Sequence, residues 1–294
     1  MDQDLGLDPA LVQRLERLAL VARQRTAGAG AGPRRSLASG SSVEFADYRT
    51  YAEGDDFRRV DWNAFARMDR LFLRVFEAEE NTTVTIFVDC SASMAGGTPP
   101  KGRLAKQVAA CLAYVALANY DRIAIAGIGD RLGPYLPPRS GRARAPEVWQ
   151  FITDLPQTGA TQLDRLAAFR GFKPAPGLAI VISDMLTPSD WRASMRTLHG
   201  ECRQQVSVLQ VLSPDELRPS IDGDWTLVDA ETGQETDVSI NPGLLSRYHQ
   251  ALVAHTTEVA SWCQQHGMAF AQLASDSAID EVVFRLLVRL GVAA

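Results

Sequence analysis

From Thr82 to the end of the chain, short continuously apolar runs alternate with longer segments of helical periodicity. Apolar runs of this length, rich in β-branched residues, are typical of strands that are buried on both faces. The predicted strands are Thr82–Asp89, Arg122–Gly129, Leu178–Asp184, Val206–Leu212 and Met268–Leu273, and the predicted helices are Lys101–Tyr120, Glu147–Leu155, Gln162–Phe172, Asp190–Leu198, Gly243–His266 and Ile279–Leu290. Strands that alternate with helices form a mostly parallel sheet with helices on both faces. We therefore predict an α/β fold with a doubly wound, mostly parallel central sheet.

Three stretches depart from this alternation and define the predicted organisation. Residues 1–42 read as an N-terminal helix, which starts at Asp8-Pro9, followed by a flexible linker rich in Gly, Ala, Ser and Pro. Residues 43–81 form an Arg- and aromatic-rich segment that we expect to pack on the sheet. Residues 82–294 form the α/β domain, with a β-hairpin insertion near 222–240.

The composition narrows the function classes. The 294 residues include 30 Lys and Arg against 35 Asp and Glu, so the net charge of −5 gives no global basic field for nucleic acid. The longest apolar run, Val108–Ala118, is well short of the roughly 20 residues that span a bilayer. Four scattered cysteines and an acidic N-terminus favour a reducing compartment without export. We expect a cytoplasmic protein with no membrane span and no nucleic-acid partner.

Polar side chains follow the first predicted strand at the point where ligands bind in open α/β sheets. The strand ends in Asp89-Cys90-Ser91-Ala92-Ser93, which places one carboxylate and two hydroxyls at alternate positions. A second carboxylate, Asp184, ends the Leu178–Asp184 strand on the same edge of the sheet. Thr161 follows a glycine-containing turn between them and supplies a third hydroxyl, with Thr158 as the weaker candidate for that role.

These oxygens together predict a metal site. Carboxylate and hydroxyl oxygens are ligands of hard divalent cations, so Mg²⁺ is the first choice, and Mn²⁺ or Ca²⁺ remain possible. The proposed ligands are Asp89, Ser91, Ser93, Thr161 and Asp184.

This pattern resembles the von Willebrand factor type A domain and its metal-ion-dependent adhesion site, which reads D-x-S-x-S, then Thr, then Asp. A further run, from Glu44 to Met94, resembles the bacterial domain-of-unknown-function 58 family. The residues that carry this second resemblance are Glu44, Arg49, Tyr51, Gly54-Asp55, Arg58, Asp61-Trp62 and Ala66-Arg67. The match is good over roughly residues 43 to 190, whereas the rest agrees only in its rhythm of helices and strands.

The resemblance implies a protein partner and no catalytic activity. In type A domains the metal keeps one coordination position open, and an Asp or Glu of another protein fills it. Members of the family are associated with AAA+ ATPases of the MoxR type, which implies an adaptor or co-chaperone that binds such an ATPase or its client. Many members carry transmembrane helices at the N-terminus, and none is seen in this sequence.

The segment from Arg49 to Arg74 mixes six arginines with five acidic residues, so it is nearly neutral. An ion-pair network anchored by aromatic side chains is the first interpretation. Because Arg and Trp are favoured anchors at interfaces, partner binding is the second. Its candidate residues are Arg49, Arg58, Trp62 and Arg67.

Two enzyme classes are alternatives to the binding module: an NTPase and a metal-dependent phosphohydrolase. Gly97–Arg103 lies where a phosphate-binding loop would lie, but it lacks the Lys-Ser/Thr pair after the second glycine. A Mg²⁺-dependent phosphohydrolase that uses Asp89 and Asp184 is the alternative function. Against it, position 91 is Ser, where aspartate-nucleophile phosphatases need a second Asp.

Overall fold

A computed structural model describes residues 8, 10–17, 43–51, 60–68, 70–78 and 82–289. The chain divides into two compact units. The first combines the N-terminal residues through Arg25 with Thr82–Ala294, and the second is Thr26–Asn81.

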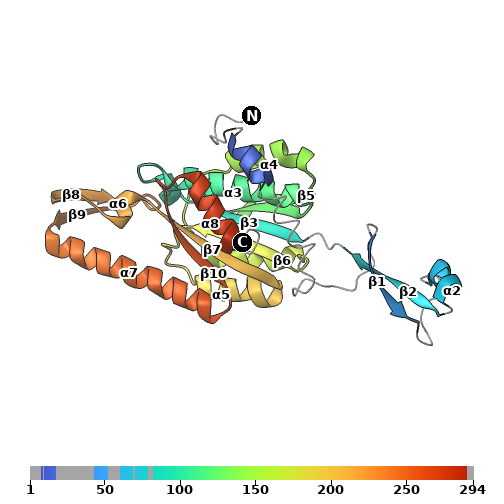
Figure 1. Ribbon diagram of the computed structural model, residues 1–294. Coiled ribbons are helices and arrows are strands. Elements are labelled where there is room, and N and C mark those ends of the chain that lie inside the picture. Colours follow the sequence, from blue (N-terminus) through green and yellow to red (C-terminus); the bar gives the residue numbers. More distant parts are fainter. Residues whose placement is uncertain are drawn as a thin grey trace. The chain divides into compact units, whose positions relative to one another are not determined.

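The first unit is built on a six-stranded sheet with the order β10-β7-β6-β3-β4-β5 (Figure 1). The strands are β3 (Thr83–Asp89), β4 (Arg122–Ile128), β5 (Leu132–Ser140), β6 (Gly177–Ser183), β7 (Gln204–Leu212) and β10 (Ala269–Ala274). Only β5 runs antiparallel to its neighbour in this sheet; the other neighbouring pairs are parallel. The predicted doubly wound, mostly parallel sheet is confirmed.

Helices cover both faces of this sheet (Figure 1). The helices described in this unit are α3 (Lys101–Ala118), α4 (Ala145–Thr153), α5 (Trp191–Arg196), α6 (Pro214–Leu217), α7 (Pro242–Gln265) and α8 (Ile279–Arg289), with 3₁₀ segments η2 (Ala92–Ala95), η3 (Arg142–Arg144) and η4 (Leu163–Phe172) and a π-helical turn, η5 (Thr197–Glu201). The predicted helix at Gln162–Phe172 is thus a 3₁₀ helix. The short α6 and η3 bury none of their residues.

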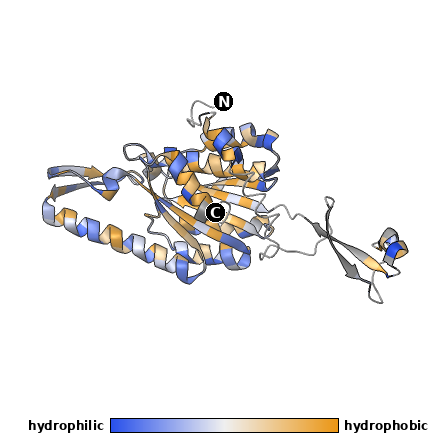
Figure 2. Ribbon diagram, viewed as in Figure 1, coloured by the Kyte–Doolittle hydropathy of each residue, from blue (hydrophilic) through white to orange (hydrophobic). Residues whose placement is uncertain are grey.

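Alternate side chains of the strands enter two separate cores. On β3, Ile86 and Val88 pack on the face covered by α3, α4 and α8, whereas Phe87 packs on the face of η4, α5 and α7. Because both faces are buried, the central strands are apolar at nearly every position, as their colour in Figure 2 shows. This double burial is the physical reason for the continuous apolar runs in the sequence.

The strand β5 has no counterpart among the predicted strands. Its sequence, LGPYLPPRS, contains three prolines, which cannot donate hydrogen bonds to a neighbouring strand. β5 tolerates them because it is an edge strand that pairs only with β4. The prolines made this segment unlike a strand in the sequence, and its position at the edge of the sheet explains why they are tolerated.

The N-terminal helix belongs to the α/β unit. Over residues 10–17 it buries Leu11 and Leu15 in the core that α3 and α8 share. Glu16 accepts a hydrogen bond from the Tyr114 hydroxyl (2.7 Å), and Arg14 pairs with Asp280 of α8. The remainder of the predicted helix, to Arg25, lies outside the described residues.

The hairpin insertion consists of β8 (Gly223–Val228) and β9 (Glu235–Ile240), which pair antiparallel in a sheet of their own. It precedes α7, whose N-cap is Asn241. Every residue of β8 is exposed, including Trp225 and Leu227.

The second unit contains β1 (Val43–Thr50), α2 (Trp62–Met68) and β2 (Phe72–Ala78). β1 and β2 pair antiparallel with an irregularity between Phe45 and Asp47. Asp61 caps α2 through its carboxylate, which accepts a hydrogen bond from the Ala64 amide (3.1 Å). The predicted packing of this segment on the central sheet stays a prediction.

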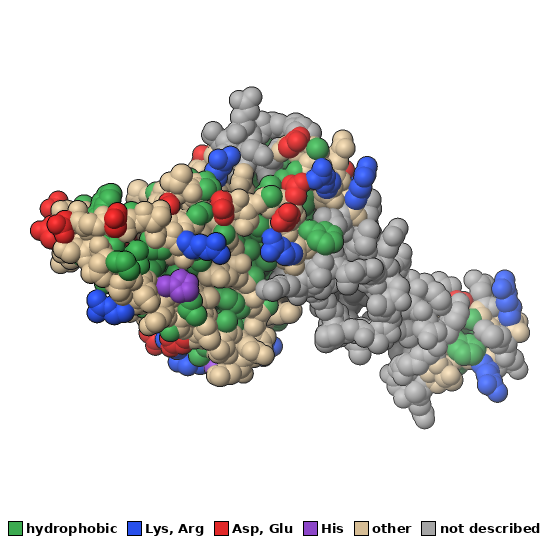
Figure 3. Space-filling model, turned by 60° about the vertical axis from the view of Figure 1, so that its left-hand side comes forward, with side chains coloured by type: hydrophobic (Ala, Val, Ile, Leu, Met, Phe, Trp, Pro, Cys, Tyr) green, Lys and Arg blue, Asp and Glu red, His purple; other side chains and the backbone are tan. Residues whose placement is uncertain are grey.

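On the face of the molecule in Figure 3, the described Lys and Arg side chains are scattered among Asp and Glu.

Among the described helices, none combines the length and the apolar character that crossing a membrane requires.

Candidate functional site

The two predicted carboxylates lie side by side at the carboxyl edge of the sheet. Asp89 ends β3, Asp184 follows β6 directly, and the two strands pair in parallel with Val88 opposite Ile182. The chain places β4 on one side of β3 and β6 on the other, so the strand order reverses at β3. Ligands of open α/β sheets bind at such a reversal.

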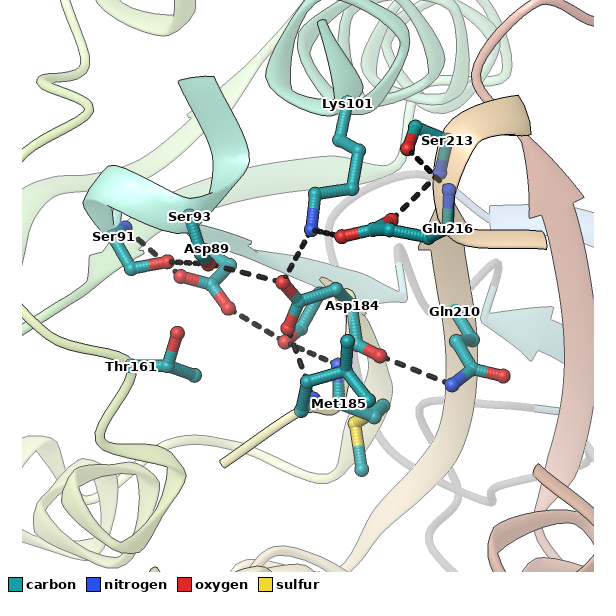
Figure 4. Close-up of polar contacts among 12 residues, drawn as sticks. Asp89, Ser91, Ser93, Lys101, Thr161, Asp184, Met185, Gln210, Ser213 and Glu216 are labelled. Atoms are coloured by element: carbon teal, nitrogen blue, oxygen red, sulfur yellow. Dashed lines mark hydrogen bonds and ion pairs between the residues drawn. The ribbon is translucent and has the colours of Figure 1, made fainter. Parts of the chain in front are cut away.

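Hydroxyl groups connect the two carboxylates (Figure 4). The Oγ atoms of Ser91 and Ser93 are 3.0 Å apart, and Ser93 Oγ donates to Asp184 Oδ2 at 3.0 Å. The Ser91 amide donates to Asp89 Oδ1 (2.9 Å), which fixes the loop after β3. Asp89, Ser91, Ser93 and Asp184 therefore form one continuous polar group, as their spacing in the sequence predicts.

Thr161 joins this group from the turn between α4 and η4. The turn is tied to the loop after β3 by two backbone hydrogen bonds: the Ala92 amide donates to the Gly159 carbonyl (2.9 Å), and the Thr158 amide donates to the Cys90 carbonyl (2.7 Å). Figure 4 shows the Thr161 hydroxyl directed toward Asp89 and Ser91. The Thr161 hydroxyl thus faces the site, as the first choice of threonine predicts, whereas the contact described for Thr158 is made by its backbone amide.

Negative charge is crowded and buried here. Asp89 and Asp184 are at most 1% exposed. Burial, and then the neighbouring charge of Asp184, raise the pKa of Asp89 to about 6, against the lowering effect of hydrogen bonds from Ser183 and Ser91. The Ser183 hydroxyl donates to Asp89 Oδ2 at 2.6 Å. Such a carboxyl pair favours a nearby cation.

The structure reveals one cation that the sequence analysis did not assign to the site. The ammonium of Lys101, at the start of α3, donates to Asp184 Oδ2 at 2.7 Å and to Glu216 Oε1 at 2.5 Å. Lys101 is only 1% exposed. Burial acts to lower the pKa of Lys101, but the two carboxylates outweigh it and the pKa is raised.

Glu216 was also missed, although its sequence carried a usable signal. Ser213-Pro214-Asp215-Glu216 follows β7, and the S-x-x-E spacing is that of a capping box. In the structure Ser213 and Glu216 do cap α6 reciprocally, and this fixes the Glu216 carboxylate against Lys101. For Lys101 the only signal was its place in the loop that resembled a phosphate-binding loop.

A third missed residue contacts the site from the hairpin insertion. The Thr161 hydroxyl donates to Glu231 Oε1 at 2.7 Å. Nothing in the sequence connects Glu231 with Thr161, because 69 residues separate them along the chain.

The donor set of these residues fits a hard divalent cation. Among the described residues no three His, Cys, Asp or Glu side chains surround a common point, so hydroxyls must complete any metal site. In an octahedral Mg²⁺ site with bonds of about 2.1 Å, adjacent ligand oxygens lie about 3 Å apart. The 3.0 Å separations along Ser91, Ser93 and Asp184 match that spacing. Four carboxylates (Asp89, Asp184, Glu216 and Glu231) outnumber the one ammonium of Lys101, so the site has excess negative charge for such an ion to balance.

The four candidate partner-binding residues belong to the second unit. Trp62 is 60% exposed and meets Phe65 edge to face with ring centroids 6.2 Å apart, and Arg67 is exposed on the same helix. Arg49 lies in β1, but its side chain is outside the described residues, as is all of Arg58. Their role stays a prediction, and so does the ion-pair network of this segment.

The fold and this edge of the sheet define the class: a doubly wound α/β protein with a buried cluster of carboxylates and hydroxyls at its strand-order reversal. The family described as "Protein of unknown function DUF58" matches residues 47–258. The chain belongs to this family, as residues 44 to 94 predicted, and the match extends well past residue 190.

Two relatives from Mycobacterium have names that state no function. The chain is 30% identical over 275 residues to the uncharacterized protein Rv1480 of Mycobacterium tuberculosis, which covers 92% of this chain and 86% of the relative. The uncharacterized protein Mb1516 of Mycobacterium bovis matches to the same extent.

Similar solved structures have low sequence identity to this chain. The conserved hypothetical protein BatB from Bacteroides thetaiotaomicron is 15% identical with a TM-score of 0.44, covering 71% of this chain and 98% of that one. An aerotolerance-related membrane protein from Bacteroides fragilis is 17% identical with a TM-score of 0.45, covering 72% and 98%. The SpRpn10 VWA domain is 9% identical with a TM-score of 0.36, covering 70% and 94%.

Proposed function

We propose that this protein is a metal-dependent protein-binding module, in which a divalent cation held by Asp89, Ser91, Ser93, Thr161 and Asp184 captures a carboxylate of a partner protein. The observation that carries the proposal is the pairing of two buried carboxylates with a chain of hydroxyls at the strand-order reversal. When bound, the metal supplies an electrophilic centre with a coordination position for a further oxygen. Mg²⁺ is the proposed ion, with Mn²⁺ or Ca²⁺ as substitutes.

The residues of the chain orient this site before any partner arrives. The Ser91 amide and the Ser183 hydroxyl hold the two oxygens of Asp89. Lys101 and the Leu186 amide hold those of Asp184. The proposed partner is an AAA+ ATPase of the MoxR type or its client, and the protein acts as its adaptor or co-chaperone in the cytoplasm.

The proposal is tested with the full chain and two variants. Asp89→Ala should lose Mg²⁺ binding in calorimetry while keeping its far-UV circular dichroism, because it removes a ligand at the end of an otherwise intact strand. Asp154→Ala, an exposed acid at the end of α4, is the control and should bind as the wild type does.

Affinity capture from native lysate then tests the partner. The wild type should retain a protein, identified by mass spectrometry, that is lost with a chelator and with Asp89→Ala. Recovery of the same protein with chelator present contradicts the metal bridge.

The Mg²⁺-dependent phosphohydrolase is a second candidate because Lys101 brings a basic group to the carboxylates. Its ammonium is already bonded to Asp184 and Glu216 and is buried, so it is poorly placed to meet a phosphoryl group. Turnover of a generic phosphoester that Asp89→Asn abolishes would establish this activity in place of the binding function.

A further inference from the structure

The β8–β9 hairpin delivers a carboxylate to the candidate metal site from within the same chain. Glu231 lies in the turn between the two strands, and its Oε1 accepts the hydrogen bond from Thr161 Oγ1 at 2.7 Å. Thr161 itself is 1% exposed. Glu231 is half-buried, although the strands beside it are almost entirely exposed. The turn therefore makes a specific contact with the α/β body.

The turn has a defined structure that presents Glu231. The Asp229 carboxylate accepts hydrogen bonds from the amides of Glu231 (2.9 Å) and Thr232 (2.7 Å), and these bonds lower the pKa of Asp229. The Asp229 amide donates to the Gln234 carbonyl (2.9 Å), which closes the turn. Gly233 has a φ of +70°, a conformation that glycine adopts without strain.

Two other acidic residues of the hairpin make their hydrogen bonds within the hairpin itself. Asp224 accepts from Ser239, and Asp237 accepts from Thr226, so both are bonded across the two strands. Glu231 instead bonds a side chain that the proposed function places on the metal. The hydrogen bond of 2.7 Å brings a Glu231 carboxylate oxygen directly beside this proposed metal ligand.

We propose that Glu231 is a built-in ligand of the metal site: its carboxylate occupies the coordination position that an Asp or Glu of a partner would fill. Partner binding then requires the turn of the β8–β9 hairpin to move away from the site. This inference rests on the proposed function. The hairpin is suited to such a displacement because it is a two-stranded sheet separate from the central one, and isolated two-stranded sheets are only marginally stable.

The test uses the full chain and Mn²⁺, whose effect on water-proton relaxation counts the water molecules bound directly to the ion. Glu231→Ala should raise that count by about one, because water replaces the carboxylate. It should also weaken Mn²⁺ binding about tenfold or more, since even outer-shell partners of metal ligands contribute about 10- to 100-fold. Acetate, as a free carboxylate probe, should lower the relaxation enhancement of this variant and leave the wild type unchanged.

Two further variants separate the possible outcomes. Glu235→Ala changes an exposed acid of the same hairpin and should match the wild type in both measurements. If Asp89→Asn loses Mn²⁺ while Glu231→Ala keeps the affinity and water count of the wild type, the proposal of a built-in ligand is wrong. The proposed metal site is then still supported. If the wild type binds no Mn²⁺, or Asp89→Asn binds it equally well, the proposed function fails and this inference fails with it.

Discussion

Lys101 is a fixed positive charge inside the candidate site. Its ammonium contacts a carboxylate on each side, Asp184 at the end of β6 and Glu216 in α6, and all three come from different parts of the chain. A charge this deeply buried is tolerated only when it is paired and hydrogen-bonded. Lys101 therefore holds the Asp184 carboxylate in place through this contact.

Replacing Lys101 with Met should destabilise the protein strongly. The variant leaves Asp184 without its ammonium partner, and breaking one side of a buried ion pair costs about 3–5 kcal/mol. The free energy of unfolding in urea measures the loss. Arg103→Ala, at an exposed position of the same helix, should change it by less than about 0.5 kcal/mol. Equal stability of the two variants would contradict the role given to Lys101.

At the scale of residues, the sequence located part of the site. Asp89, Ser91 and Ser93 could be found because they stand at alternate positions directly after a strand, and Asp184 because it ends another apolar run. The contacts of Lys101, Glu216 and Glu231 with the site could not be found, since they are made across the fold; the capping-box spacing of Glu216 indicated only its helix start.

Among the elements, the pairing of β3 with β6 decides whether the site exists. At the start of this pair, Gly177 lies opposite Thr83, and a Cβ on Gly177 would collide with the Thr83 carbonyl oxygen. The close approach of the two backbones therefore requires glycine. The same pairing brings Asp89, six residues after Thr83, beside Asp184, seven residues after Gly177.

Gly177→Ala should weaken this pairing. Since the obstacle is backbone, which cannot move aside as a flexible side chain can, we expect a loss of about 1–3 kcal/mol in the free energy of unfolding. Gly171→Ala is the control, because a Cβ there meets nothing within 4 Å. Urea denaturation of both variants measures the difference. An unchanged unfolding midpoint for Gly177→Ala would show that β3 and β6 can move apart at this position without a loss of stability.

In the whole molecule, the second unit interrupts the α/β unit in sequence. The helix over 10–17 precedes residues 43–78 along the chain, yet its Leu11 and Leu15 are buried in the core of the α/β unit. Residues 43–78 thus form an insertion between one helix of the α/β unit and its first strand.

Because of this arrangement, two deletions should differ in their effect on the stability of the α/β unit. Replacing residues 43–78 with a short Gly-Ser linker should leave a single cooperative unfolding transition for the α/β unit. Removing residues 1–81 also removes Leu11 and Leu15, and losing one buried leucine typically costs about 2–5 kcal/mol. The protein without residues 1–81 should therefore unfold at a clearly lower urea concentration than the protein without residues 43–78. Equal midpoints would mean that the N-terminal helix contributes nothing to the core.

The sequence by itself determined the doubly wound sheet, because strands buried on both faces must be apolar at nearly every position, and it indicated the family through the residues around Asp89. Only the tertiary structure decided which strands are neighbours, that the proline-rich β5 occupies an edge, and that Lys101, Glu216 and Glu231 meet the predicted site. The physical reason is the range of the interactions. Burial leaves a pattern of apolar residues along the chain, whereas a hydrogen bond between distant side chains leaves no such pattern.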